Sequence, residues 1–203
     1  MNEQEILKED LLSLNPKEFY IKYIVKSHNW YFSNYLKFSQ DEILDKMDFF
    51  KEIVSSQLDI SFHSLQIVGS AKTGFSLSPQ KALQPFHDGL PGQPSSDIDI
   101  AIISERIYRK FWDKLREIRG LWYKGYFSHL TESIFRGYIN DKDILRIPDL
   151  REEWENLTSP INVSLQDKLG FVHPITYRVY RSWDDLEDYQ LSGISKAKKA
   201  LEV

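Results

Sequence analysis

The chain has 203 residues, a formal net charge of −4, and 41% hydrophobic and 28% charged residues, a balance typical of folded globular proteins. It excludes intrinsic disorder and disfavours a bulk nucleic-acid binder, because such binders are usually strongly basic. The sequence contains no cysteine, which excludes disulfides, thiolate catalysis and cysteine-ligated metals.

The beginning of the sequence predicts helices. Residues 3–13 have the apolar spacing of a short amphipathic helix. Asn15-Pro16 is typical of an N-cap followed by a first helical residue, and we expect the helix that it starts to run to about Leu36. The aromatic residues of that helix are interpreted as core, since aromatic side chains dominate core burial.

A capping-box pattern at residues 39–42 predicts a further helix that reaches about Gln57. We therefore expect an N-terminal helical segment over residues 1–38. Residues 39–203 are expected to form one globular unit.

Two predicted strands flank a long polar loop in the middle of the chain. The first is an apolar run that ends at Val68, directly before Gly69-Ser70, and the second covers residues 97–104. Between them, Phe75–Ser96 is rich in proline and glycine. Irregular loops of this length are uncommon in compact domains and are often functional, although a surface insertion is also well tolerated.

The second half of the sequence alternates helical and strand patterns. A helix is predicted from Glu105 to about Arg119, another over 127–138, a strand over 173–181, and a final helix from Ser182 to about Leu201; the region 140–172 is expected to be interrupted at Pro148, Pro160 and Gly170. This pattern predicts an α/β (α+β) fold, with a small mixed sheet flanked by helices.

Asp97 and Asp99 open the second predicted strand. Side chains alternate along a strand, so the two carboxylates point to the same face, opposite Ile98 and Ile100. Two like charges side by side are costly unless a cation lies between them. The pattern predicts a divalent metal at Asp97 and Asp99. The five histidines show no metal-ligand spacing.

The Gly69-Ser70 turn predicts a phosphate-binding element. Backbone N–H groups at such a turn can cradle a phosphate, and Lys72 lies just beyond it. A metal and a phosphate together indicate nucleotidyl-transfer chemistry. The P-loop motif and the Gly-x-Ser-x-Gly motif are both absent from the sequence, which argues against a P-loop NTPase and an α/β-hydrolase.

Gly69-Ser70 after an apolar strand, followed by Asp97-Ile98-Asp99 on the next strand, resembles the nucleotidyltransferase fold of the polymerase-β superfamily over about residues 40–181. The resemblance implies that 39–203 is a nucleotidyltransferase-like domain. It further implies that Gly69, Ser70 and Lys72 bind the triphosphate of an NTP such as ATP, and that Asp97 and Asp99 are the catalytic, metal-binding pair for Mg²⁺ (or Mn²⁺).

The implied activity is transfer of an NMP from an NTP to a hydroxyl of an RNA, a protein or another nucleotide. Small members of the superfamily occur in bacterial toxin–antitoxin and phage-defence settings, so a partner protein or a homo-oligomer is also expected. The N-terminus is unlike a signal peptide and no run approaches the roughly 20 apolar residues of a membrane span. We therefore expect a cytoplasmic protein with no membrane partner.

The sequence departs from the superfamily pattern in two ways. The spacer 71–96 is longer than in the smallest members, and the predicted strand 173–181 carries no acid, with Arg178 where a third carboxylate is expected. Asp141, Asp143, Asp149 and Asp167 are the substitutes left open.

The third carboxylate is the expected general base in this superfamily. Its absence leaves open an alternative, namely a catalytically inactive module of the same fold that binds a nucleotide, an RNA or a partner protein. A purely structural role, with Asp97 in a turn and Ser70 as a helix cap, is also left open.

Overall fold

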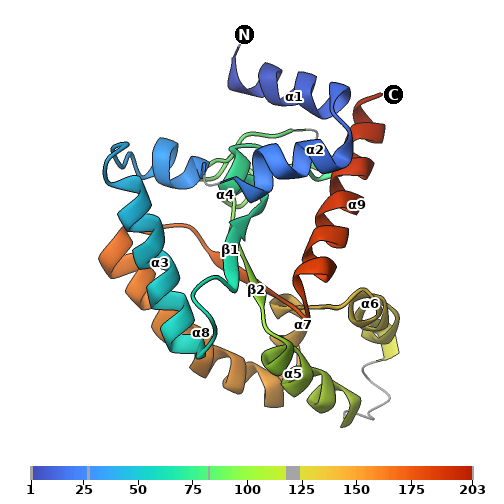
Figure 1. Ribbon diagram of the computed structural model, residues 1–203. Helices are drawn as coiled ribbons and strands as arrows, with labels where there is room; N and C mark the ends of the chain where they lie inside the picture. The colour runs from blue at the N-terminus through green and yellow to red at the C-terminus, as the bar shows by residue number, and fades with distance from the viewer. Residues whose placement is uncertain (1, 27, 82, 118–123, 203) are drawn as a thin grey trace.

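A four-stranded mixed sheet with helices on both faces forms the centre of the molecule, which confirms the predicted α/β (α+β) class (Figure 1). The computed structural model describes residues 2–26, 28–81, 83–117 and 124–202. No helix within these residues is long and apolar enough to cross a membrane.

The sheet contains both predicted strands of the candidate site. Its strands are β1 (Leu65–Val68), β2 (Ile98–Ile103), β3 (Tyr138–Asn140) and β4 (Ile175–Tyr180). Their order is β1-β2-β4-β3, in which β2 and β4 are parallel and the other two pairs are antiparallel. The two central strands are therefore β2 and β4. β2 begins at Ile98, one residue later than predicted, so it carries Asp99 while Asp97 directly precedes it.

The helices follow the chain in this order: α1 (Glu3–Ser13), α2 (Pro16–Tyr20), the π-helical segments η1 (Ile21–Val25) and η2 (Tyr31–Tyr35), α3 (Ile43–Leu58), α4 (Gly69–Thr73), the 3₁₀ turn η3 (Pro79–Lys81), α5 (Glu105–Glu117), α6 (Lys124–Phe135), α7 (Asp141–Ile144), α8 (Pro148–Leu169) and α9 (Trp183–Leu201). The helix predicted over 3–13 and the cap at Ser182 are confirmed. The expected end of α5 at Arg119 lies outside the described residues.

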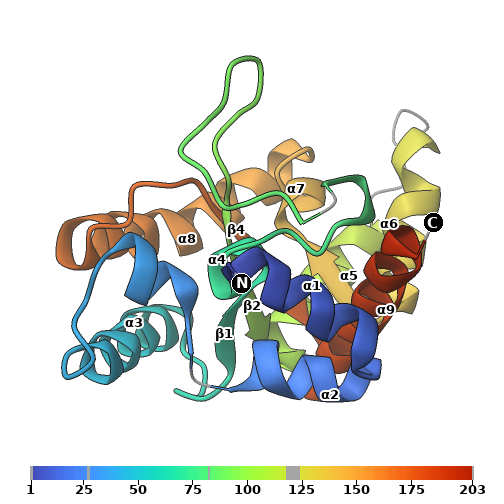
Figure 2. The same cartoon turned by 90° about the horizontal axis from the view of Figure 1, so that it is seen from above.

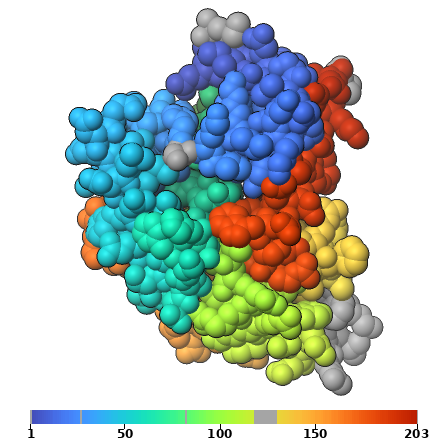
Figure 3. Space-filling view, viewed as in Figure 1, coloured from blue at the N-terminus to red at the C-terminus, as the bar shows by residue number. Residues whose placement is uncertain are grey.

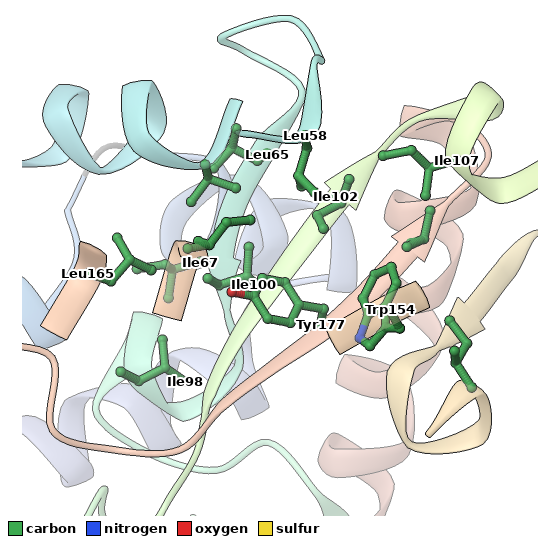
Figure 4. Packing of buried hydrophobic residues seen from close by; sticks show 14 of the residues in the cluster. Leu58, Leu65, Ile67, Ile98, Ile100, Ile102, Ile107, Trp154, Leu165 and Tyr177 are labelled. Atoms are coloured by element: carbon green, nitrogen blue, oxygen red, sulfur yellow. The ribbon is translucent and has the colours of Figure 1, made fainter. Parts of the chain in front are cut away.

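Two hydrophobic cores lie on opposite faces of the sheet. The larger one places Ile98, Ile100 and Ile102 of β2 and Tyr177 of β4 against α3 and α8 (Figure 4). The smaller one places Ala101 and other residues of the second face against α1, α2 and α9. Asp97 and Asp99 share this second face, as the alternation of the strand predicted.

The helix predicted from Asn15 to about Leu36 is wrong in its length. Asn15 caps α2 as expected, but Lys26 has extended backbone angles (φ −61°, ψ 152°) and interrupts the helix. The reason is tertiary: Ile24, before the break, packs in the smaller core, whereas Tyr31, after it, packs in the larger one. A straight helix presents one apolar stripe and cannot serve two cores on opposite faces.

The region 140–172 is more regular than its prolines predicted. Pro160 lies inside α8 without ending it. Pro160 is exposed, so water can hydrogen-bond to the backbone carbonyl that loses its helical partner there. The buried residues Trp154, Ile161 and Leu165 hold the helix on both sides of the proline.

The helix predicted over 127–138 is also too long at its end. The φ angle of Gly137 is +75°, a backbone conformation that ends the helical path. Tyr138 therefore belongs to β3 and pairs with Tyr180 of β4.

Candidate functional site

The Gly69-Ser70 turn and the acidic strand meet directly. Val68, the last residue of β1, pairs with Asp99 of β2, and Gly69 follows with a φ of +66°. A Cβ atom at Gly69 would overlap Oδ2 of Asp99 and would lie 3.3 Å from its Cγ. Only glycine permits this close approach, so the chain is built to hold a carboxylate against the turn.

Asp97 and Asp99 differ in their surroundings. The Asp97 side chain is 31% exposed, and its Oδ2 lies 3.3 Å from Nζ of Lys142. Burial raises the pKa of Asp99, and the neighbouring carboxylate of Asp97 raises it further. The hydroxyl of Thr176 donates to Oδ1 of Asp99 over 2.9 Å. The pair is therefore a partly buried negative charge with one open side.

The strand next to Asp99 presents a hydroxyl and a cation where a third acid was expected. Thr176 stands directly across from Asp99 in the parallel β2–β4 pair. Arg178 follows on the same face, with its guanidinium 4.5 Å from the ring centroid of Tyr189. The positive charges of Arg178 and Lys142 both favour the ionised form of Asp99.

Of the four substitutes for the third carboxylate, Asp141 comes nearest to the site. Lys142 and Arg178 act electrostatically on Asp141 as they do on Asp99. However, its Oδ2 accepts a hydrogen bond from the backbone N–H of Tyr177, and burial raises its pKa to about 6. Asp141 therefore satisfies a backbone N–H of β4 just beyond the end of β3.

The other three acids belong to different surroundings. Asp143 lies 3.9 Å from Arg146. Asp149 of α8 lines a surface hollow together with Lys110 of α5. Asp167 is exposed near the end of α8. The charges and the hydrogen bond that shift the pKa of Asp99 come from Asp97, Arg178, Thr176 and Lys142.

Lys72 lies apart from the acidic pair. Its side chain is 5% exposed, and its Nζ donates to the carbonyl oxygen of Lys26. It lines a pocket beside β1 that neither Asp97 nor Asp99 reaches. Lys142 is the lysine that contacts the pair, and local sequence gave no signal for it because it is brought there by β3 and α7 from a distant part of the chain.

The base of the Phe75–Ser96 loop is anchored, and its tip extends away from the body (Figure 2). Asp88 accepts a hydrogen bond from the Tyr35 hydroxyl over 2.6 Å and lies 3.1 Å from Nε2 of His173. At the other end, the hydroxyl of Ser96 accepts a hydrogen bond from the backbone N–H of His87. Ser96 directly precedes Asp97, so this hydrogen bond joins the loop to the residue next to the acidic pair.

The acidic pair fits a metal only in a particular way. Among the described residues, no group of three or more His, Cys, Asp or Glu side chains is placed to hold a metal ion. Mg²⁺ is commonly held by one or two carboxylates together with substrate phosphates and water. At this site the chain supplies two carboxylates, Asp97 and Asp99, and the backbone of Gly69 lies directly against Asp99.

A comparison of the chain with protein-family models, with curated proteins and with solved structures found no match.

Proposed function

We propose that the chain is a magnesium-dependent nucleotidyltransferase that transfers an NMP from an NTP, such as ATP, to a hydroxyl acceptor. The observation that supports this most directly is the contact between Asp99 and the Gly69 turn. A partly buried pair of carboxylates beside an open turn is the combination that a metal–triphosphate complex needs. The acceptor is an RNA end, a protein side chain or a second nucleotide.

In this proposal Asp97 and Asp99 hold Mg²⁺ (or Mn²⁺), which neutralises the charge on the phosphates. Gly69 and Ser70 position the triphosphate next to the pair. Lys142, which lies at the open side of Asp97, takes the phosphate-binding role that was expected for Lys72. The acceptor oxygen forms a bond to the α-phosphorus, and the bond to the β-phosphate breaks as pyrophosphate leaves.

The acceptor hydroxyl must also lose a proton. Thr176, which faces Asp99, cannot serve as a strong base, and Asp141 is held by the Tyr177 N–H. We therefore assign the proton to a substrate phosphate oxygen or to water. This assignment predicts slow turnover compared with an enzyme that has a carboxylate base, since general-base catalysis commonly contributes 10²–10⁴-fold.

A second candidate function is an inactive module that binds a nucleotide, an RNA or a partner protein. The Lys142–Asp97 ion pair favours it, because a lysine beside the carboxylates can replace a metal as the neutralising charge. Thr176 in place of an acid favours it as well. The two functions differ in one observable property, the release of pyrophosphate.

The test is an incubation of the protein with Mg²⁺ and each labelled NTP, with and without total RNA, followed by measurement of pyrophosphate. We expect release by the wild type and none by Asp97→Ala/Asp99→Ala. The matched control is Asp113→Ala/Asp167→Ala, which removes two exposed aspartates from α5 and α8. This control should behave as the wild type.

Two outcomes decide against the proposal. If pyrophosphate release survives in Asp97→Ala/Asp99→Ala, the site is assigned to the wrong residues. If the wild type binds an NTP in a metal-dependent manner but releases no pyrophosphate with any acceptor, the protein is the inactive nucleotide-binding module.

A further inference from the structure

The pocket beside β1 that Lys72 lines lies away from the acidic pair. It has a volume of about 190 Å³ and opens where the N-terminal segment, the β1–α4 region and the start of α9 meet (Figure 3). At roughly 30 Å³ per water molecule, this volume accommodates one small ligand. Its lining residues are Val25, Lys26, Asn29, Phe32, Met47, Phe50, Lys51, His63, Leu65, Gln66, Ile67, Lys72 and Trp183.

The ionisable residues of this lining are all basic. Lys26, Lys51, Lys72 and His63 line the pocket, and no aspartate or glutamate does. Lys51 is the only one of the three lysines with a recorded ion pair in the described residues, 3.2 Å from Asp48. Asp48 does not itself line the pocket, so the lining keeps an excess of positive charge.

Lys72 is the innermost of these cations. The carbonyl oxygen of Lys26 accepts one hydrogen bond from its ammonium group, and the described residues provide no carboxylate within ion-pair distance. An ammonium group has three donors, so two of them remain available. Burial lowers the pKa of Lys72 to about 8, and the charge of Lys51 contributes to the decrease.

The side-chain amide of Gln66 is a second polar group of the pocket lining with an unused hydrogen-bond donor. Nε2 of Gln66 is buried and has no hydrogen-bond partner in the described residues. Buried donors without partners are rare in native proteins and usually indicate an ion, a ligand or a water molecule that is not shown. Gln66 and Lys72 line one pocket, so both groups can be satisfied by a single acceptor-rich ligand.

We propose that this pocket binds a small dianion of the phosphate type, either free phosphate or the phosphate of a monoester. Phosphate supplies acceptor oxygens to Lys72 and Gln66 and neutralises the charge of Lys72. The apolar side chains of Val25 and Trp183 are 51% and 44% exposed, and they favour a monoester with an apolar or aromatic body. The site is independent of the proposed transferase activity.

The experiment measures binding of inorganic phosphate and of phenyl phosphate by calorimetry, at pH 7.5, in low salt and without metal. We expect Lys72→Met to weaken both affinities at least tenfold. Lys199→Met, which removes an exposed lysine from α9, should bind both probes as the wild type does. Asp97→Ala/Asp99→Ala should also bind both, so a failure of the proposed function leaves this result unchanged.

The two probes distinguish the two sources of phosphate. Tighter binding of phenyl phosphate that is lost in Trp183→Ala indicates a monoester, whereas equal affinities indicate free phosphate. The proposal is overturned if the wild type binds neither probe at 10 mM, a concentration on the scale of weak sites, or if Lys72→Met binds them as well as the wild type does.

A second measurement covers the case in which Lys72→Met does not fold. The ¹³Cε resonance of Lys72 in the wild type reports its titration directly. We expect phosphate to raise the pKa of Lys72 from about 8, because an anion stabilises the ammonium form. A pKa that phosphate leaves unchanged contradicts the proposal. Lys51→Gln, which keeps Lys72 intact, should weaken phosphate binding by a smaller factor.

Discussion

Nζ of Lys142 lies 3.3 Å from Oδ2 of Asp97, so a lysine from the start of α7 neutralises the carboxylate that directly precedes β2. The Lys142 side chain is 60% exposed and can therefore move. It competes with a metal ion for Asp97 and is also placed to meet the phosphates that a metal would bring. These two roles predict opposite effects of one substitution.

We predict that Lys142→Met strengthens metal binding but weakens nucleotide binding. Exposed ion pairs contribute about 0–1 kcal/mol, so the affinity for Mn²⁺ alone should rise by at most about fivefold. The affinity for the Mn²⁺–NTP complex should instead fall. Titration followed by electron paramagnetic resonance measures the first quantity, and a fluorescent NTP measures the second. Lys142→Arg keeps the charge and serves as the control; an unchanged Mn²⁺ affinity in Lys142→Met would show that the pair does not compete with metal.

Gly69→Ala should be more destabilising than an ordinary glycine substitution. Both Gly69 (φ +66°) and Gly92 (φ +78°) have left-handed backbones, but an added Cβ meets Asp99 at the first and nothing within 4 Å at the second. Gly92→Ala should therefore lower the free energy of unfolding by about 1 kcal/mol, the cost of the backbone conformation alone. Gly69→Ala should lower the free energy of unfolding by about 1–3 kcal/mol more than Gly92→Ala does, as measured by chemical denaturation.

The additional loss in Gly69→Ala is expected to depend on Asp99. In an Asp99→Ala background the overlapping oxygen is absent, so Gly69→Ala should then cost no more than Gly92→Ala. A double-mutant cycle measures this coupling. Additive effects would mean that the turn and the carboxylate do not touch in solution.

Asp141→Asn should change how stability depends on pH. The folded-state pKa of Asp141 is raised to about 6 from 3.8, so the folded state binds more protons than the unfolded state between these values. The stability that the protonated form contributes is present below the unfolded pKa and is lost as the pH rises through about 6. The difference between these two pKa values corresponds to at most about 3 kcal/mol in the free energy of unfolding.

The substitution to asparagine removes the titration of Asp141 and keeps an acceptor for the Tyr177 N–H. Relative to the wild type, Asp141→Asn should therefore gain stability between pH 4 and pH 7, as measured by urea unfolding. Asp167→Asn, at an exposed position on α8, should show no such gain. A gain of equal size in both variants would contradict the raised pKa of Asp141.

Lys72→Met should stabilise the protein at neutral pH in phosphate-free buffer. The folded-state pKa of Lys72 is lowered to about 8 from 10.5, so the unfolded state binds more protons between these values. The cost of burying the charge is fully present below about pH 8 and disappears above the unfolded pKa. After subtraction of the lost hydrogen bond to Lys26, a net gain of about 1–2 kcal/mol is expected at pH 7.

The gain in Lys72→Met should decrease as the pH rises from 8 to 10, and unfolding curves at several pH values measure this trend. Lys199→Met provides the baseline for loss of an exposed lysine. If Lys72→Met instead destabilises the protein at pH 7 without phosphate, the buried ammonium group has a stronger partner than the carbonyl oxygen of Lys26.

Features that depend on near neighbours in the chain could be predicted from the amino-acid sequence. The alternation around Ile98 placed both carboxylates on one face of β2, and the Asn15 and Ser182 caps started their helices where expected. These features follow from backbone geometry over a few residues. Asp97 and Asp99 could therefore be named as a pair without any coordinates.

Long-range packing sets which distant residues meet that pair. Pairing of β1 with β2 brings Gly69 to Asp99, the parallel β4 places Thr176 across from it, and β3 with α7 delivers Lys142. The same packing buries Lys72 in a separate pocket, although its position next to the turn predicted the opposite. Strand register and burial are set by the sum of long-range packing, and no short stretch of sequence encodes that sum.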